Sequence, residues 1–144
     1  AMGHSLEITI RGDLDFFPGY AIGPAYGAES FDYESMRGSR LVTIVPESNF
    51  FSDDIGVYYN GGCYFDTDEI DNCKVLAYYQ DLGQAAIIHC TVGKGQAVLL
   101  GVHPEITPDD IDESDDFFGP FYADFREAEC FRKPLLQALL KLLC

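Results

Sequence analysis

The sequence has 144 residues, the length of one domain, and 47% of them are apolar. This composition supports a sizeable core and excludes a disordered chain. The formal net charge is −15, from 24 acidic and 9 basic residues. Such a surface repels phosphate groups, so neither nucleic acid nor an anionic membrane is expected as a partner. No apolar run reaches the roughly 18 residues that a membrane-spanning helix needs, and no signal peptide is visible.

The cysteine pattern indicates a reducing compartment. The five cysteines are an odd number, and no two of them stand in Cys-x-x-Cys spacing. Neither a disulfide framework nor a zinc site is predicted, and no cofactor is expected. We therefore expect a cytoplasmic location.

Both ends of the sequence look cut. Residues 1–5 resemble a cloning scar and are set aside, which leaves 6–144 as one partial domain. Residues 135–144 stop inside an apolar helical pattern. We expect the chain to be an excised piece of a longer protein.

The first hundred residues predict strands joined mostly by short turns, so the sheet should be largely antiparallel. Residues 16–27, rich in aromatics, Gly and Pro, predict a loop. The pair Asn60-Gly61 predicts a hairpin, because both residues accept positive φ. Two continuous apolar strands around Gly93-Lys94-Gly95 suggest burial on both faces, in the middle of the sheet. The seven predicted strands are residues 6–10, 40–45, 55–59, 63–65, 74–79, 85–92 and 96–102.

After residue 103 the pattern changes to an acidic loop followed by helices. Residues 109–116 are acidic at six of eight positions, but the spacing does not fit a calcium-binding EF-hand loop, and a solvated loop is favoured. Helical patterns follow at 121–131 and at 135–143, with Pro134 at the first turn of the last helix. That last helix has little polar face, so it should be buried.

His103-Pro104-Glu105, at the end of the last predicted strand, is a candidate catalytic pair. The His103 ring could take a proton from a thiol or hydroxyl, and the Glu105 carboxylate could orient the ring and stabilise its charged form. The alternative is a strand-terminating turn whose glutamate caps a helix or loop.

A nucleophile for this pair is not evident. It would normally stand in a Gly-x-Cys/Ser-x-Gly turn between a strand and a helix, and no cysteine or serine here has that setting. Cys63 follows Asn60-Gly61-Gly62, but a small buried residue on a strand explains it better. His89 and Cys90 lie within one predicted strand, as a satisfied core histidine and an inert thiol.

Several motifs in combination resemble one known family. Gly101 to Glu105 resembles the His/Glu signature of class I glutamine amidotransferases. In order and approximate spacing, the motifs resemble the amidotransferase-like N-terminal domain of eukaryotic-type biotin protein ligases (holocarboxylase synthetases). They are Asp15-Phe16-Phe17-Pro18-Gly19, Gly23-Pro24-Ala25-Tyr26, Tyr58-Tyr59-Asn60-Gly61-Gly62, and Cys90 to Gly95 leading to His103-Pro104-Glu105.

The resemblance implies a class I glutamine amidotransferase-like, flavodoxin-like α/β domain. Such a domain opens with a parallel half that ends in the nucleophile elbow. This chain looks like the second half, with a mixed or mostly antiparallel sheet and C-terminal helices. The resemblance makes His103 and Glu105 the counterparts of the catalytic His and Glu, and places Asn60, Gly61 and Gly62 in a substrate-pocket loop. The biotinyl-adenylate loop of the ligase has no counterpart, so this chain alone is not expected to ligate biotin.

Two functions follow. The first is a non-catalytic regulatory or interaction domain of a biotin-protein-ligase-like protein, with an incomplete amidotransferase-like centre. The alternative is part of an active Cys-His-Glu thiol hydrolase or glutamine amidotransferase whose nucleophile lies upstream or on another chain. A weaker hypothesis recruits Cys63 as the nucleophile. Removal of a parallel half-sheet would expose a strand edge and an apolar face, so we also expect a homodimer or contact with other domains of the parent protein.

Overall fold

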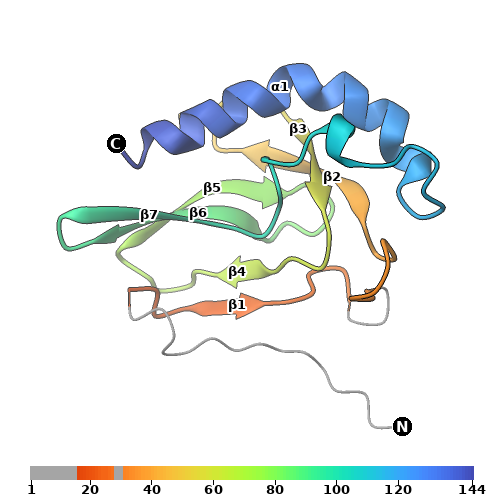
Figure 1. The fold of residues 1–144 in the computed structure, drawn as a ribbon. Helices are drawn as coiled ribbons and strands as arrows, with labels where there is room; N and C mark the ends of the chain where they lie inside the picture. Colours follow the sequence, from red (N-terminus) through yellow and green to blue (C-terminus); the bar gives the residue numbers. More distant parts are fainter. Residues whose placement is uncertain (1–15, 28–30) are drawn as a thin grey trace, which may run out of the picture.

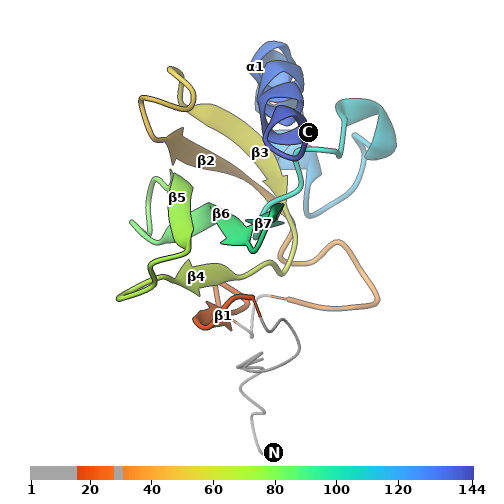
Figure 2. The same cartoon turned by 90° about the vertical axis from the view of Figure 1, so that its left-hand side faces the viewer.

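One curved antiparallel sheet forms the body of the protein, and one long helix crosses it (Figures 1 and 2). The computed structural model describes residues 16–27 and 31–144. Within them the strands are β1 (Tyr20–Ile22), β2 (Arg40–Pro46), β3 (Ile55–Tyr59), β4 (Tyr64–Asp66), β5 (Cys73–Tyr79), β6 (Ala85–Val92) and β7 (Gly95–Leu100). The 3-10 turns η2 (Pro108–Asp110) and η3 (Gly119–Phe121) lead into helix α1 (Tyr122–Lys141).

The strand order is β1-β4-β6-β5-β2-β3, with β7 also paired to β6. All the pairings between these strands are antiparallel. Beyond β7 the chain crosses to the far strand of this path. The Gly101 N–H still donates to the Ala86 carbonyl (2.8 Å), and the His103 N–H donates to the Tyr58 carbonyl in β3 (2.9 Å). The sheet is therefore curled enough for the segment after β7 to meet β3.

The adjacent residues Ile87 and Ile88 of β6 face opposite sides of the sheet, as the pleat of a strand requires. Ile87 belongs to the main core between the sheet and α1, which includes Leu135 and Leu139 of the helix. Ile88 and Cys90 belong to a second core with Phe17 and Phe65. Strand β6 therefore buries apolar side chains on both faces, and five of its eight residues are buried.

Helix α1 is one continuous element, so the prediction of two separate helices is wrong. Pro134 lies inside the helix, is exposed, and removes one backbone hydrogen bond, at a cost of about 3 kcal/mol. Buried residues on both sides of it offset that cost by packing against the body of the protein: Phe125, Arg132, Leu135 and Leu139. Gly56 of β3 lets Ala128 of the helix approach closely, because a Cβ at Gly56 would lie 3.2 Å from that of Ala128.

The coarse fold class is confirmed: an α/β domain with an antiparallel sheet and a C-terminal helix. Strands β2, β3, β5 and β6 match their predicted ranges within one residue at each end. The predicted strand at residues 6–10 lies outside the described residues. In the described part of the chain, no helix is both long and apolar enough to cross a membrane.

Three local predictions are wrong. The Asn60-Gly61 turn does not form a hairpin, because β3 pairs with β2 whereas β4 pairs with β1 and β6. Strand β7 is not central. Among the described strands it pairs with β6 alone, and all six of its residues are partly or fully exposed. The predicted loop at 16–27 contains the short strand β1, which forms by pairing with β4.

Candidate functional site

The predicted pair His103 and Glu105 is assembled. Nδ1 of His103 and Oε1 of Glu105 are 2.8 Å apart, the arrangement in which a carboxylate orients an imidazole ring. The bridge to Tyr58 fixes the backbone of His103 at the edge of β3. The side chains are 42% and 57% exposed, respectively. Among the described residues, Nε2 of His103 has no hydrogen-bond partner, so this nitrogen is the one open to a proton from a reacting group.

A buried arginine holds the turn between these two side chains. Arg132 of α1 is 5% exposed, and its Nη1 donates to the carbonyl oxygen of Pro104 at 2.6 Å. Its Nε and Nη2 donate to the two carboxylate oxygens of Glu129 at 2.6 and 2.5 Å. This bidentate pair raises the pKa of Arg132 and lowers the pKa of Glu129. Helix α1 thus fixes the position of the turn at residues 103–105.

The loop after β3 lies next to the same segment through backbone contact. A Cβ at Gly62 would overlap the carbonyl oxygen of Gly101, and a Cβ at Gly101 would overlap that of Cys63. The Tyr79 hydroxyl donates to the Cys63 carbonyl (2.7 Å) and lies 3.0 Å from the Gly101 carbonyl. These contacts bring the predicted pocket loop beside the strand end that carries His103.

Asn60 and Gly61 complete this loop in different ways. Gly61 has a φ of 66°, and a Cβ there would overlap the ring of Phe31. The side-chain oxygen of Asn60 is buried without a hydrogen-bond partner, a condition that a native protein seldom leaves unexplained. The loop is therefore closely packed rather than open, with one unsatisfied acceptor.

No nucleophile completes the pair in the described part of the chain, where no thiol or hydroxyl forms a hydrogen bond with His103. Burial raises the pKa of the Cys63 thiol, which keeps it protonated and weakly nucleophilic. Cys130 and Cys144 are exposed on the C-terminal helix and the residues after it. The described residues also contain no group of three or more His, Cys, Asp or Glu side chains placed to hold a metal.

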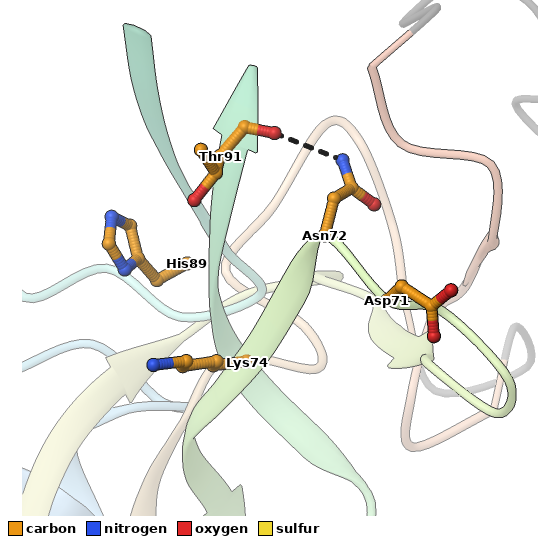
Figure 3. A pocket seen from close by; sticks show the side chains of 5 residues that line it. All are labelled: Asp71, Asn72, Lys74, His89 and Thr91. Atoms are coloured by element: carbon orange, nitrogen blue, oxygen red, sulfur yellow. Dashed lines mark hydrogen bonds between the residues drawn. The ribbon is translucent and has the colours of Figure 1, made fainter. Parts of the chain in front are cut away.

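A separate hollow of about 350 Å³ opens at the ends of β5 and β6 (Figure 3). Its lining residues are Asp71, Asn72, Lys74, His89 and Thr91. The Asn72 amide donates to the carbonyls of Phe16 (2.8 Å) and Thr91 (3.2 Å), so it is a structural clamp. His89 was expected to be a satisfied core histidine. It is only partly buried, and its buried Nε2 lacks a partner, so that expectation is wrong.

Arg132 was not predicted as a functional residue, because it lies between the two predicted helices, 121–131 and 135–143. One signal could have found it. Arg132 is seven residues after Phe125 and three before Leu135, which places a charged side chain on the buried face of the helix. A charge at such a position needs a partner inside the protein.

These features define an α/β domain with a positioned His–carboxylate pair and, among residues 16–27 and 31–144, no evident nucleophile. The chain belongs to the family of biotin-protein ligase N-terminal domains, whose family model matches residues 1–144. It is 36% identical over 143 residues to a biotin–protein ligase of Schizosaccharomyces pombe, which covers 96% of this chain and 21% of that protein. It is 38% identical over 109 residues to an uncharacterised protein of Chlamydia muridarum, covering 71% of this chain and 39% of that protein. The chain thus spans less than half the length of either relative, and no solved structure matches it.

Proposed function

We propose that this chain is a regulatory or interaction domain of a biotin-protein-ligase-like protein and does not itself catalyse ligation. The family and the S. pombe relative support a connection to biotin ligation. The relative is about five times longer than the matched segment, which leaves room for the ligase chemistry elsewhere. The domain would act on that chemistry through contact.

One observation carries this proposal. The His103–Glu105 pair is assembled at 2.8 Å, yet in the described chain no thiol or hydroxyl meets Nε2. The thiol nearest in sequence to the pocket loop, Cys63, is held in its protonated form by burial. A base without a group to deprotonate is an incomplete amidotransferase-like centre, and we propose that the domain is the second half of a class I, flavodoxin-like amidotransferase fold.

A second candidate follows from the exposure of the same ring. His103 is 42% exposed, and its Nε2 is not blocked. A cysteine from another chain or from another part of the parent protein could reach it. The domain would then be part of an active Cys-His-Glu hydrolase or glutamine amidotransferase, with His103 as base and Glu105 as its orienter.

We further propose a cytoplasmic setting and contact either with a second copy or with other domains of the parent protein. The five free cysteines suit a reducing compartment. Phe131, Leu140 and Leu143 of the C-terminal region are 41%, 54% and 50% exposed, and apolar surface of this kind favours protein contact. Light scattering of the isolated chain that shows a monomer at micromolar concentration would exclude the homodimer.

Ammonia release from glutamine separates the two candidate functions. For the isolated chain we expect none above buffer, with or without His103→Ala. For the full-length parent protein, the regulatory proposal predicts that His103→Ala leaves glutamine hydrolysis undetectable and changes only the biotin-transfer rate. Glutamine turnover by the parent that disappears in both His103→Ala and Glu105→Ala variants would establish the hydrolase instead.

A further inference from the structure

Two cysteines face each other across the β5–β6 pair. Cys73 lies directly opposite Cys90 in the register of the two strands. The neighbouring Thr91 N–H donates to the Asn72 carbonyl at 2.8 Å, so Asn72 and Thr91 are a hydrogen-bonded pair. The next rung, Cys73 and Cys90, is consequently a non-hydrogen-bonded pair, the type in which opposite side chains approach most closely.

Figure 3 labels the four residues that flank this rung. Asn72 comes directly before Cys73, the first residue of β5, and Lys74 directly follows it. His89 and Thr91 precede and follow Cys90 on β6. These four flanking residues line the hollow. The two thiols point to the opposite face of the sheet, into the core that contains Phe65 and Ile88.

The two thiols differ in accessibility. Cys90 is fully buried, whereas Cys73 is partly exposed and its Sγ donates to Oδ1 of Asn72 at 3.6 Å. Burial and the adjacent Cys73 thiol raise the pKa of Cys90 to about 12. Because Cys90 is fully buried and Cys73 is partly exposed, an attack on an external oxidant begins at Cys73.

We propose that Cys73 and Cys90 form a reversible disulfide by exchange with a low-molecular-weight disulfide of the glutathione type. The Cys73 thiolate attacks one sulfur of the oxidant, which breaks the S–S bond of the oxidant, forms a mixed disulfide at Cys73 and releases one thiolate. The Cys90 thiol gives its proton to the thiolate released in the first step, and its sulfur attacks Sγ of Cys73. This attack breaks the mixed disulfide, forms the Cys73–Cys90 bond and releases the second thiol. Two protein thiols are oxidised, and one external disulfide is reduced to two thiols.

The bridge would tie together the two strands that form the hollow. It closes the chain between residues 73 and 90, which includes the Asp81-Leu82-Gly83 turn. For a closed loop of this size, the chain-entropy model raises the folding equilibrium constant on the order of a hundredfold. Rare disulfides in reducing compartments are typically transient and redox-sensing, and the strand register already places these two cysteines opposite each other.

Mass spectrometry of the full chain tests the proposal. Trypsin cuts after Arg40, Lys74 and Lys94, which places Cys73 in peptide 41–74 and Cys90 in peptide 75–94. Cys63 shares the first peptide and packs on the same core, so the experiment uses a Cys63→Ser background. After incubation with oxidised glutathione and alkylation of the remaining thiols, we expect the linked 41–74/75–94 pair as the dominant disulfide, and we expect dithiothreitol to remove it.

Two controls decide the outcome. The same incubation in guanidinium chloride should lose the preference for this link, because the strand register is gone. In Cys90→Ser the glutathione adduct should persist at Cys73, whereas with Cys90 present it should be transient. The proposal is wrong if the native chain links these peptides no more than it links Cys130 or Cys144, or if Cys73 keeps its glutathione adduct while Cys90 is intact.

Discussion

The two turns of the candidate site are stabilised by different kinds of interaction. The turn at residues 60–63 is held by space and neutral hydrogen bonds: a glycine–backbone contact at Gly62 and Gly101, and the buried hydroxyls of Tyr59 and Tyr79. The turn at 103–105 is held by charge, through the Arg132 guanidinium and its partner Glu129. The first should respond to side-chain volume, and the second to protonation and loss of charge.

This difference bears on function. The close-packed turn at residues 60–63 suits a structural role, whereas the position of the turn at 103–105 depends on Arg132 of α1. Helix α1 also carries exposed apolar residues such as Leu140. A partner that binds α1 would act directly on the element that positions His103 and Glu105. The mutations below separate the two kinds of support.

The largest effect is expected from Gly101→Ala. The added Cβ overlaps the Cys63 carbonyl oxygen and lies 2.5 Å from the Tyr79 hydroxyl, so two backbone segments must separate. We expect a loss of more than about 3 kcal/mol in the free energy of unfolding, measured by urea denaturation. Gly83→Ala is the matched control, because that site is open and has a φ of +67°. It should cost roughly 1–2 kcal/mol from backbone strain alone; an equal loss in both variants would refute the contact as the cause.

Arg132→Met should come next. It leaves the Pro104 carbonyl without its donor and Glu129 without its partner, while it keeps most of the apolar stem. Hydrogen bonds to charged groups contribute about 1.5–3 kcal/mol, and we expect a loss in that range in urea denaturation. The chemical shifts of the His103 ring should also change in NMR spectra.

Arg126→Met is the control for that variant. Arg126 pairs with Asp109 at 3.2 Å on the surface, where the side chains are 56% and 85% exposed. Such exposed pairs contribute little to stability because solvent screens them, so we expect almost no change in urea unfolding and no shift of the His103 signals. If both variants lose the same stability and leave His103 unchanged, Arg132 is not what holds the turn.

Local patterns predicted much of this fold, and long-range contacts account for what they missed. Alternating and continuous apolar runs located β2, β3, β5 and β6, because burial of one or both faces dictates those patterns. The Asn60-Gly61 pair favours a hairpin locally, but Gly62 packs on Gly101. The chain therefore continues into β4, which pairs with β1 and β6 instead of folding back onto β3. Pro134 marks a helix boundary by propensity, yet packing of Phe125 and Leu135 on either side keeps one helix intact.

The candidate site also has a part that local sequence patterns predict and a part that depends on long-range contacts. His103 and Glu105 are two residues apart, so a short motif was enough to predict them. Arg132 is 28 residues from Pro104, and no local pattern relates the two. The rung that joins Cys73 and Cys90 likewise depends on strand register, which single-strand patterns do not specify.

Tyr79→Phe tests the uncharged hydrogen bonds that hold the turn at residues 60–63. Tyr79 is fully buried, and its hydroxyl lies within hydrogen-bond distance of the carbonyl oxygens of Cys63 and Gly101. Removing the hydroxyl leaves buried acceptors unsatisfied, at a cost of about 1–3 kcal/mol in thermal or urea unfolding. The effect should not change between pH 4 and 8, since no charged group is lost. Tyr33→Phe, at a site that is 76% exposed, should stay within about 0.5 kcal/mol of the parent.

The smallest expected effect is the pH dependence of the stabilisation that the Arg132–Glu129 ion pair gives. Arg132 lowers the pKa of Glu129 below its ordinary value of 4.5. The stabilisation is therefore fully present above that value and is lost as the pH falls through the lowered folded-state pKa. Because the Glu129 side chain is 38% exposed, solvent screening limits the effect to about 1 kcal/mol or less. Urea unfolding of the parent and of Glu129→Gln should differ most above pH 4.5 and converge in acid. A difference that is constant with pH would mean that Glu129 acts by packing, and that the turn at 103–105 does not depend on its charge.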